Sequence, residues 1–178
     1  MRYAVIGTLI IFFVASVIAP SNAHSRPFLA GTVSLEIISD SGTVFQSLLY
    51  QDYKSGETRV IKKYLEAKKG ENYGIVIKNN TAGRIGVVMA ADGRNIITGG
   101  MSDLKNSETM YIVNPFETAR YDGWRTTENE VHRFYFTDPM DSYSVRTFDD
   151  SSAMGVIAVA VFREKEFRSL TSLRQTPR

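Results

Sequence analysis

One histidine, His132, lies inside a segment with a strand pattern, and histidine is the side chain best suited to proton transfer near neutral pH. A Ser–His–Asp arrangement would have to combine it with Ser142 or Ser144 and with Asp138 or Asp141. No Gly-x-Ser-x-Gly elbow accompanies these residues, and a histidine in a strand is more often structural. We therefore predict no catalytic residue.

Four aspartates fall in one serine-rich stretch, at positions 138, 141, 149 and 150. Oxygen ligands from a loop suit calcium. However, the spacing does not follow the Asp-x-Asp-x-Asp-Gly pattern, and no glutamate follows at the required distance. Aspartate and serine also build turns and helix caps. We predict a loop without a metal. We also predict no cofactor, because Gly-x-Gly-x-x-Gly and Gly-x-x-x-x-Gly-Lys are both absent.

Carboxylate pairs are the catalytic groups of glycoside hydrolases, and Glu117, Glu128 and Glu130 offer one. Such a pair is not specific in a chain with 19 acidic residues. A hydrolase that acts on envelope polysaccharide or peptide through carboxylates is therefore the alternative function. A pocket with two carboxylates of raised pKa, or His132 beside an aspartate and a serine, would favour it.

Aromatic residues provide the best candidates for recognition. The single tryptophan, Trp124, follows an Asp-Gly turn and precedes Arg125. A tryptophan in such a place stacks on sugar rings or anchors a protein partner, or else it is partly buried in the core. Loops on a rigid sheet usually hold recognition residues. The predicted contact residues are Arg94, Asn95, Trp124, Arg125, Asp141 and Tyr143.

The N-terminus has the three parts of a secretory signal. Met1-Arg2 is a positive head, residues 3–19 are an apolar run, and Ser21 with Ala23 forms a small-x-small exit. We predict cleavage after Ala23. An uncleaved anchor is the alternative, although the run is near the lower length limit for spanning a bilayer. The predicted mature protein is extracytoplasmic, either periplasmic or secreted, with no membrane span.

The composition excludes several classes of protein. The 178 residues include 21 Lys+Arg and 19 Asp+Glu, which excludes a strongly basic nucleic-acid binder and a highly charged disordered chain. The absence of cysteine excludes a disulfide scaffold and a thiolate zinc site. We expect residues 1–23 to be the signal peptide, 24–31 a flexible lead-in, 32–164 a single domain and 165–178 a charged tail.

From Thr32 onward the dominant hydrophobic period is two residues, as in Val33, Leu35 and Ile37. About eight to ten short strands, frequent turns and no long amphipathic helix predict an antiparallel β-sandwich with short helical turns in loops. A small barrel is the alternative. Residues 156–162 are apolar on both faces and predict a central strand.

Turn residues divide the predicted strands. Residues 73–78 and 84–91 are predicted to form a hairpin through the turn residues 79–83. Asp92-Gly93 predicts a second tight turn, and Asp122-Gly123 a third. The basic stretch 62–69 is predicted to form one or two helical turns.

Several short segments occur in a characteristic order: Asn79-Asn80-Thr81, Val88 to Ile97, Gly123 to Thr126, Arg133 to Phe136, Asp141 to Tyr143 and Gly155 to Phe162. In this order, over roughly residues 73–164, the chain resembles a family of exported bacterial proteins of unassigned function. The resemblance implies export and a β-rich fold, but no substrate or catalytic residue. We expect a non-enzymatic exported domain that binds a protein or a cell-envelope component. A structural subunit of an envelope assembly is a third possibility.

Overall fold

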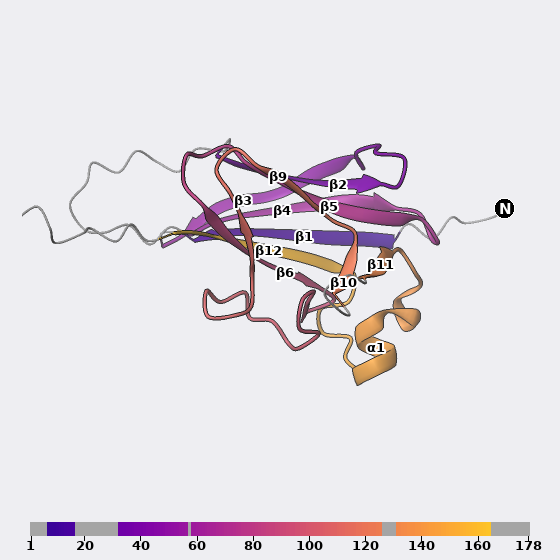
Figure 1. Cartoon of the computed structure of the whole chain (residues 1–178). Helices are drawn as coiled ribbons and strands as arrows, with labels where there is room; N and C mark the ends of the chain where they lie inside the picture. The colour runs from indigo at the N-terminus through magenta and orange to yellow at the C-terminus, as the bar shows by residue number, and fades with distance from the viewer. Residues whose placement is uncertain (1–6, 17–31, 57, 126–130, 165–178) are drawn as a thin grey trace, which may run out of the picture.

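The computed structural model describes residues 7–16, 32–56, 58–125 and 131–164, which form two β-sheets packed face to face (Figure 1). The larger sheet has the strand order β3 (Ser47–Ser55), β4 (Thr58–Ala67), β1 (Gly7–Ser16), β12 (Val156–Arg163), β6 (Ile85–Ala91) and β7 (Arg94–Asn95), and β8 (Tyr111–Val113) also pairs with β6. The smaller sheet has the order β10 (Gly123–Arg125), β11 (Val131–Tyr135), β5 (Asn72–Asn79) and β2 (Val33–Ser39), and β9 (Thr118–Tyr121) also pairs with β5. The 3₁₀ turn η1 (Pro139–Asp141) and the helix α1 (Tyr143–Phe148) follow β11. Neither sheet closes on itself through these strands, which confirms the predicted mostly β, antiparallel sandwich.

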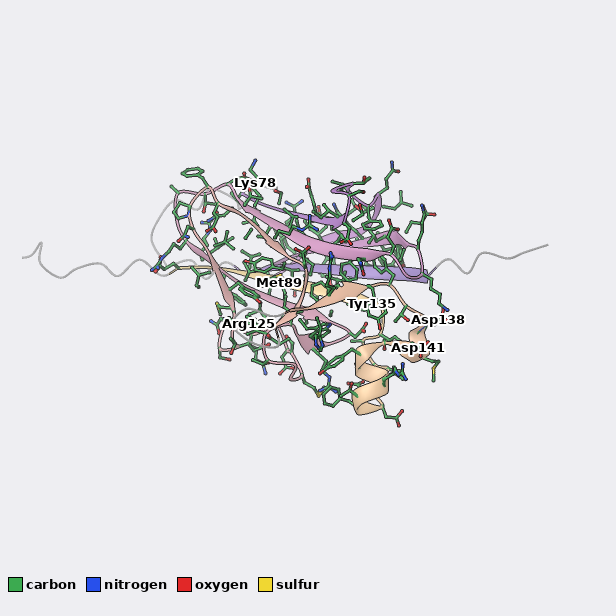
Figure 2. The ribbon with its side chains drawn as sticks, turned by 45° about the vertical axis from the view of Figure 1, so that its right-hand side comes forward. Lys78, Met89, Arg125, Tyr135, Asp138 and Asp141 are labelled. Atoms are coloured by element: carbon green, nitrogen blue, oxygen red, sulfur yellow. The ribbon has the colours of Figure 1, made fainter. Side chains whose placement is uncertain are left out.

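One apolar core fills the space between the sheets, because side chains alternate between the two faces of a strand. Ile85 and Met89 of β6 enter it from the larger sheet, and Ile75 and Ile77 of β5 enter it from the smaller one. Figure 2 shows Met89 between the sheets and Lys78 on the outside. The two-residue period therefore marks the core face of each strand.

The strand β12 is central, as its apolar pattern predicts. It lies between β1 and β6 in the larger sheet. Ile157 and Val159 belong to the core, and Ala160, which points to the opposite face, is also fully buried. The central position is confirmed, but the opposite face is covered only in part, because Val156, Ala158 and Phe162 on it are half-exposed.

The predicted hairpin of residues 73–78 and 84–91 is wrong. β5 belongs to the smaller sheet and β6 to the larger one, so the chain crosses between the sheets at residues 80–84. Both strands have a mostly apolar face, and on opposite sheets these faces can bury against the same core. Residues 79–83 do contain the connection that their residue types predict. However, this connection joins strands of two different sheets and not neighbouring strands of one sheet.

The basic stretch 62–69 is also not helical, since it mostly continues β4, which extends to Ala67. Leu65 is buried in the core, and Ile61 and Ala67 pack against it. These residues recur at a spacing of two or four, so the apolar period places the segment in a strand. Burial of that face outweighs the helical preference of the lysines.

The apolar part of the predicted signal forms β1 in this structure, between β4 and β12. β1 is antiparallel to β4 and parallel to β12, and β1–β12 is the one parallel pair among the described strands. β4 and β12 are therefore antiparallel to each other. Cleavage after Ala23 would remove β1 and leave these two strands facing one another.

We expect β4 to pair directly with β12 in a mature chain that begins at His24. In the present register Lys62 and Ala158 lie opposite the same β1 residue, Phe12, and Ile61 and Val159 lie in the adjacent row. Direct pairing keeps Ile61 and Val159 on the core side. It also brings the Cα atoms of Lys62 and Ala158 from about 10 Å to about 5 Å, which is within disulfide range.

The measurement is oxidation of a Lys62→Cys/Ala158→Cys variant, in a chain that has no cysteine of its own. An intramolecular disulfide is expected in the mature chain and not in the uncleaved chain. As a control, Ala90→Cys/Ala158→Cys joins residues already paired across β6 and β12 and should cross-link in both. Disulfide-linked dimers of the mature chain in place of the internal bond would contradict direct pairing.

Among the described residues, no helix has the length and apolar character needed to cross a bilayer. The predicted lead-in, residues 24–31, and the predicted tail, residues 165–178, lie outside the described residues. Cleavage of the signal and export of the protein stay predictions.

Candidate functional site

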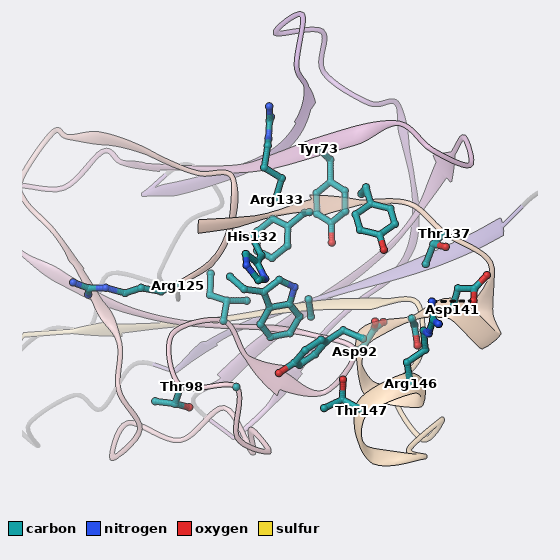
Figure 3. A pocket seen from close by; sticks show the side chains of 18 residues that line it. Tyr73, Asp92, Thr98, Arg125, His132, Arg133, Thr137, Asp141, Arg146 and Thr147 are labelled. Carbon is teal, nitrogen blue, oxygen red and sulfur yellow. Dashed lines mark ion pairs between the residues drawn. The ribbon is translucent and has the colours of Figure 1, made fainter. Parts of the chain in front are cut away.

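The candidate site is a cavity of about 420 Å³ at the end of the sandwich where β10 and β11 meet α1 (Figure 3). Its walls come from β5, the β6–β7 turn, β10, β11 and the η1–α1 segment. This volume lies within the range of small-molecule sites, ~300–1,000 Å³. Figure 1 shows α1 below the β10–β11 end of the smaller sheet.

The β6–β7 turn supplies Asp92 to the cavity. Asp92 and Gly93 have φ values of 48° and 75°, as in the two-residue type I′ turn that aspartate and glycine favour. The predicted tight turn is therefore confirmed. Asp92 Oδ1 accepts a hydrogen bond of 2.8 Å from the backbone N–H of Gly155, which holds the carboxylate beside the start of β12.

The helix α1 supplies Tyr143 and is held in place by Arg94. Ser142 caps the helix by accepting a hydrogen bond from a backbone N–H of its first turn. Arg94 Nη2 lies 3.2 Å from Asp150 Oδ2, just after the helix, and the guanidinium carbon lies 3.8 Å from the ring centroid of Phe148. The charge and the ring contact together fix α1 against the β6–β7 turn.

Aromatic rings form one wall of the cavity. The Tyr73 ring lies nearly parallel to the Phe134 and Phe136 rings, with centroid distances of 5.1 Å and 4.5 Å. Trp124 contacts the Tyr143 ring at 4.8 Å and the Phe134 ring at 6.0 Å. Trp124 is half-buried: it packs against the core and also lines the cavity. The partial burial that the sequence analysis allowed is therefore observed, and a role of Trp124 in recognition stays a prediction.

Two polar groups at the cavity, the Tyr73 hydroxyl and the second oxygen of Asp92, have no hydrogen-bond partner among the described residues. The Tyr73 side chain is only 7% exposed, and its hydroxyl points into the cavity (Figure 3) without a hydrogen-bond partner among the described residues. Burial raises the pKa of the Asp92 carboxyl, because desolvation disfavours the charged form. No cation in the described part of the chain pairs with Asp92. A hydroxyl without a partner and a half-buried carboxylate with one oxygen free, both at the cavity wall, favour a ligand that forms hydrogen bonds.

The charges at the rim of the cavity are largely neutralised. Arg133 pairs with Asp40, and Arg146 Nη1 lies 3.7 Å from Asp141 Oδ1. Figure 3 shows Arg125 extending away from the cavity. The rim therefore has no strong preference for an anion or a cation.

Four of the six predicted contact residues line this cavity: Trp124, Arg125, Asp141 and Tyr143. Arg94 and Asn95 are buried and do not line it. Asn95 Nδ2 donates to the Thr109 carbonyl at 3.0 Å, and its Oδ1 accepts from the Ile97 N–H at 2.9 Å. The structure thus places Arg94 and Asn95 under the loops that they hold.

His132 also lines the cavity, and so do Asp141 and Ser142, the residues that a catalytic triad would need. Figure 3 shows His132 and Asp141 at opposite sides of the cavity. The His132 side chain makes no hydrogen bond to another described residue, and Ser142 Oγ serves as the cap of α1. No group of three or more His, Cys, Asp or Glu side chains that would suit a metal occurs in the described part of the chain.

The sequence interpretation missed Tyr73 as a site residue, and it predicted the turn of residues 92–95 as a contact region without naming Asp92 among the contact residues. Tyr73 is the second residue of β5, and Asp92 is the first residue of a turn. The pattern of a strand or a turn requires neither the hydroxyl nor the carboxylate. Their shared cavity depends on five segments that are distant in the sequence, so no local signal identifies them.

No protein-family model matches the chain, and neither a curated protein nor a solved structure shows significant similarity to it. The resemblance to a family of exported bacterial proteins stays a prediction. The function is therefore inferred from the cavity itself.

Proposed function

We propose that the protein is an exported, non-enzymatic binding module that holds a cell-envelope component in the cavity between the β10–β11 edge and α1. The observation that supports this most is the combination of an aromatic wall with two polar groups: the Tyr73 hydroxyl, which has no hydrogen-bond partner among the described residues, and the Asp92 carboxylate, whose one partner there is the Gly155 N–H. Aromatic walls with a few converging polar groups are typical of sites that hold small ligands.

A binding role is favoured over catalysis by the state of the side chains that could react. The His132 side chain has no hydrogen-bond partner among the described residues, and Asp141 is ion-paired with Arg146. A general base needs the proton that it removes, or an orienting partner, within hydrogen-bond reach.

A carboxylate hydrolase is the second candidate, because Asp92 and Asp141 both line the cavity and burial raises the pKa of Asp92. Release of reducing ends or peptides from an envelope fraction by the mature protein, abolished in Asp92→Asn, would establish this alternative. The binding proposal expects retention of the fraction without turnover.

The binding proposal is tested by co-sedimentation of the mature protein with an isolated envelope fraction. Tyr143→Ala is expected to lower the retained protein at least fivefold, because it removes a ring that contacts Trp124 at the cavity wall. Tyr53→Ala on β3 is the matched control, since both tyrosines are 43% exposed and Tyr53 lies outside the cavity. Equal retention of the two variants, both shown to be folded, would reject the cavity as the binding site.

A further inference from the structure

We propose that the cavity accepts one sugar ring of an envelope glycan, with the Tyr73 hydroxyl and the Asp92 carboxylate hydrogen-bonded to its hydroxyl groups. This inference rests on the proposed binding function and specifies its ligand. It follows from what Tyr73, Asp92 and the aromatic wall can each accept.

The Tyr73 hydroxyl requires a polar ligand. Tyr73 is more than nine-tenths buried, and its ring is enclosed by Phe134 and Phe136. The hydroxyl is therefore the part of Tyr73 that reaches the cavity, and it has no hydrogen-bond partner among the described residues. A purely apolar ligand would cover this hydroxyl and the free oxygen of Asp92 without giving either a hydrogen bond, which is unfavourable.

The Asp92 carboxylate requires a ligand that donates hydrogen bonds. One of its oxygens, Oδ1, already accepts from the Gly155 N–H, and no side-chain donor in the described part of the chain reaches the other. A carboxylate accepts at both oxygens and cannot donate when ionised. Vicinal hydroxyls of a sugar both donate and accept, so they match Asp92 and Tyr73 at the same time.

The arrangement of the rings favours a sugar over an organic ammonium ion. An ammonium site needs open aromatic faces around the cation. Here the Tyr73 face is covered by two phenylalanines, and the Trp124 ring is tilted at 39° against Tyr143. Trp124 and Tyr143 still offer apolar surface against which the C–H face of a sugar can pack. The paired charges at the rim add no preference for a charged ligand.

The experiment uses Trp124 as its reporter, because it is the only tryptophan in the chain and it lines the cavity. The mature protein is titrated with cellobiose and N,N′-diacetylchitobiose while tryptophan emission is recorded, and saturation-transfer NMR detects binding that leaves emission unchanged. We expect saturable binding of at least one of the two. Tyr73→Phe is expected to raise Kd about fivefold and Asp92→Asn at least tenfold. The matched controls, Tyr53→Phe and Asp103→Asn, lie on exposed surface outside the cavity and should leave Kd unchanged.

A second measurement separates a binding role of Asp92 from a structural one. Because burial raises the pKa of Asp92, its ionised form opposes folding at neutral pH, and this destabilisation is relieved as the pH falls through the raised pKa. Asparagine tolerates the positive φ and can still accept from Gly155. Asp92→Asn is therefore expected to raise Tm at neutral pH while it weakens sugar binding. A lower Tm together with an unchanged Kd would overturn the assignment of Asp92.

The outcomes separate this inference from the proposed function. If neither sugar binds, or if binding is the same in Tyr73→Phe, Asp92→Asn and wild type, the sugar assignment is wrong. It is also wrong if tetramethylammonium binds and Asp92→Asn abolishes that binding. In each of these cases a reduced envelope retention of Tyr143→Ala would still support the binding function. If Tyr143→Ala and Tyr53→Ala were also retained equally by the envelope fraction, both the sugar assignment and the binding function would be overturned.

Discussion

Replacement of Gly123 with alanine is expected to lower the free energy of unfolding by more than about 3 kcal/mol. Gly123 pairs with Arg133 across β10 and β11, and an added Cβ atom would lie 2.1 Å from the His132 carbonyl oxygen and 2.6 Å from its carbonyl carbon. These are backbone atoms of the neighbouring strand, which cannot rotate away as a side chain can. β10 and β11 would have to separate, and they hold Trp124 and Phe134 at the cavity wall.

The measurement is denaturant unfolding of the mature protein, followed through tryptophan emission. Gly86→Ala is the matched control, because its added Cβ would meet the Met110 side chain, at 2.2 Å from the sulfur. Because a flexible methionine side chain can move, Gly86→Ala is expected to lower the free energy of unfolding by about 1 kcal/mol. If the two variants lose similar amounts of unfolding free energy, the close approach of the β10 and β11 backbones at Gly123 does not explain the cost of Gly123→Ala. We also expect Gly123→Ala to lose envelope retention, since the cavity depends on the β10–β11 pair.

Replacement of Asn79 with alanine is expected to lower the free energy of unfolding by about 3–4 kcal/mol, because a buried hydrogen-bond network is lost. Asn79 is fully buried, and its Nδ2 donates to the carbonyl oxygens of Gly83 at 2.8 Å, Asn114 at 2.9 Å and Val113 at 3.3 Å. Its Oδ1 accepts from the backbone N–H of Thr81 at 3.0 Å. These bonds tie together the two places where the chain crosses between the sheets, β5 to β6 and β8 to β9. The alanine variant leaves the buried carbonyls without donors.

Asn114→Ala provides the comparison, since Asn114 is an exposed asparagine in the second crossing and only its backbone contacts Asn79. Asn114→Ala is expected to change the free energy of unfolding by less than about 0.5 kcal/mol. Asn79→Asp should be nearly as damaging as Asn79→Ala, because a carboxylate keeps the acceptor but places negative charge against three carbonyl oxygens. Denaturant midpoints of the three variants measure these differences. A tolerated Asn79→Ala would mean that the crossings are held by the strands alone.

The strands themselves were accessible to sequence interpretation because burial imposes a local period. Val33 to Ile37 and residues 156–162 have the side-chain patterns of a half-buried and a fully buried strand, and both form strands in the structure. The Asp92-Gly93 turn was equally accessible, since its positive φ values restrict the residue types. Where composition and period disagreed, as in residues 62–69, the period was the better guide.

Strand pairing could not be predicted from these local patterns. An apolar face at residues 73–77 and another at 85–91 are equally compatible with neighbours in one sheet and with opposing strands of two sheets. The buried Asn79 and the shared core place them in opposing sheets. The same applies to Arg94 and Asn95, which were predicted as contact residues from their place beside a turn. The structure buries them because α1 and the 97–109 loop pack over that turn.

By itself, the amino-acid sequence determined the mostly β, antiparallel class and the positions of most strands. These depend on side-chain alternation and on backbone preferences, which act between residues close together in the chain. Only the tertiary structure decided which strands share a sheet, and only it brought Tyr73 and Asp92 into one cavity with Trp124. The reason is that burial is a property of the assembled sheets. Whether a hydroxyl or a carboxylate lacks a partner depends on every segment that surrounds it.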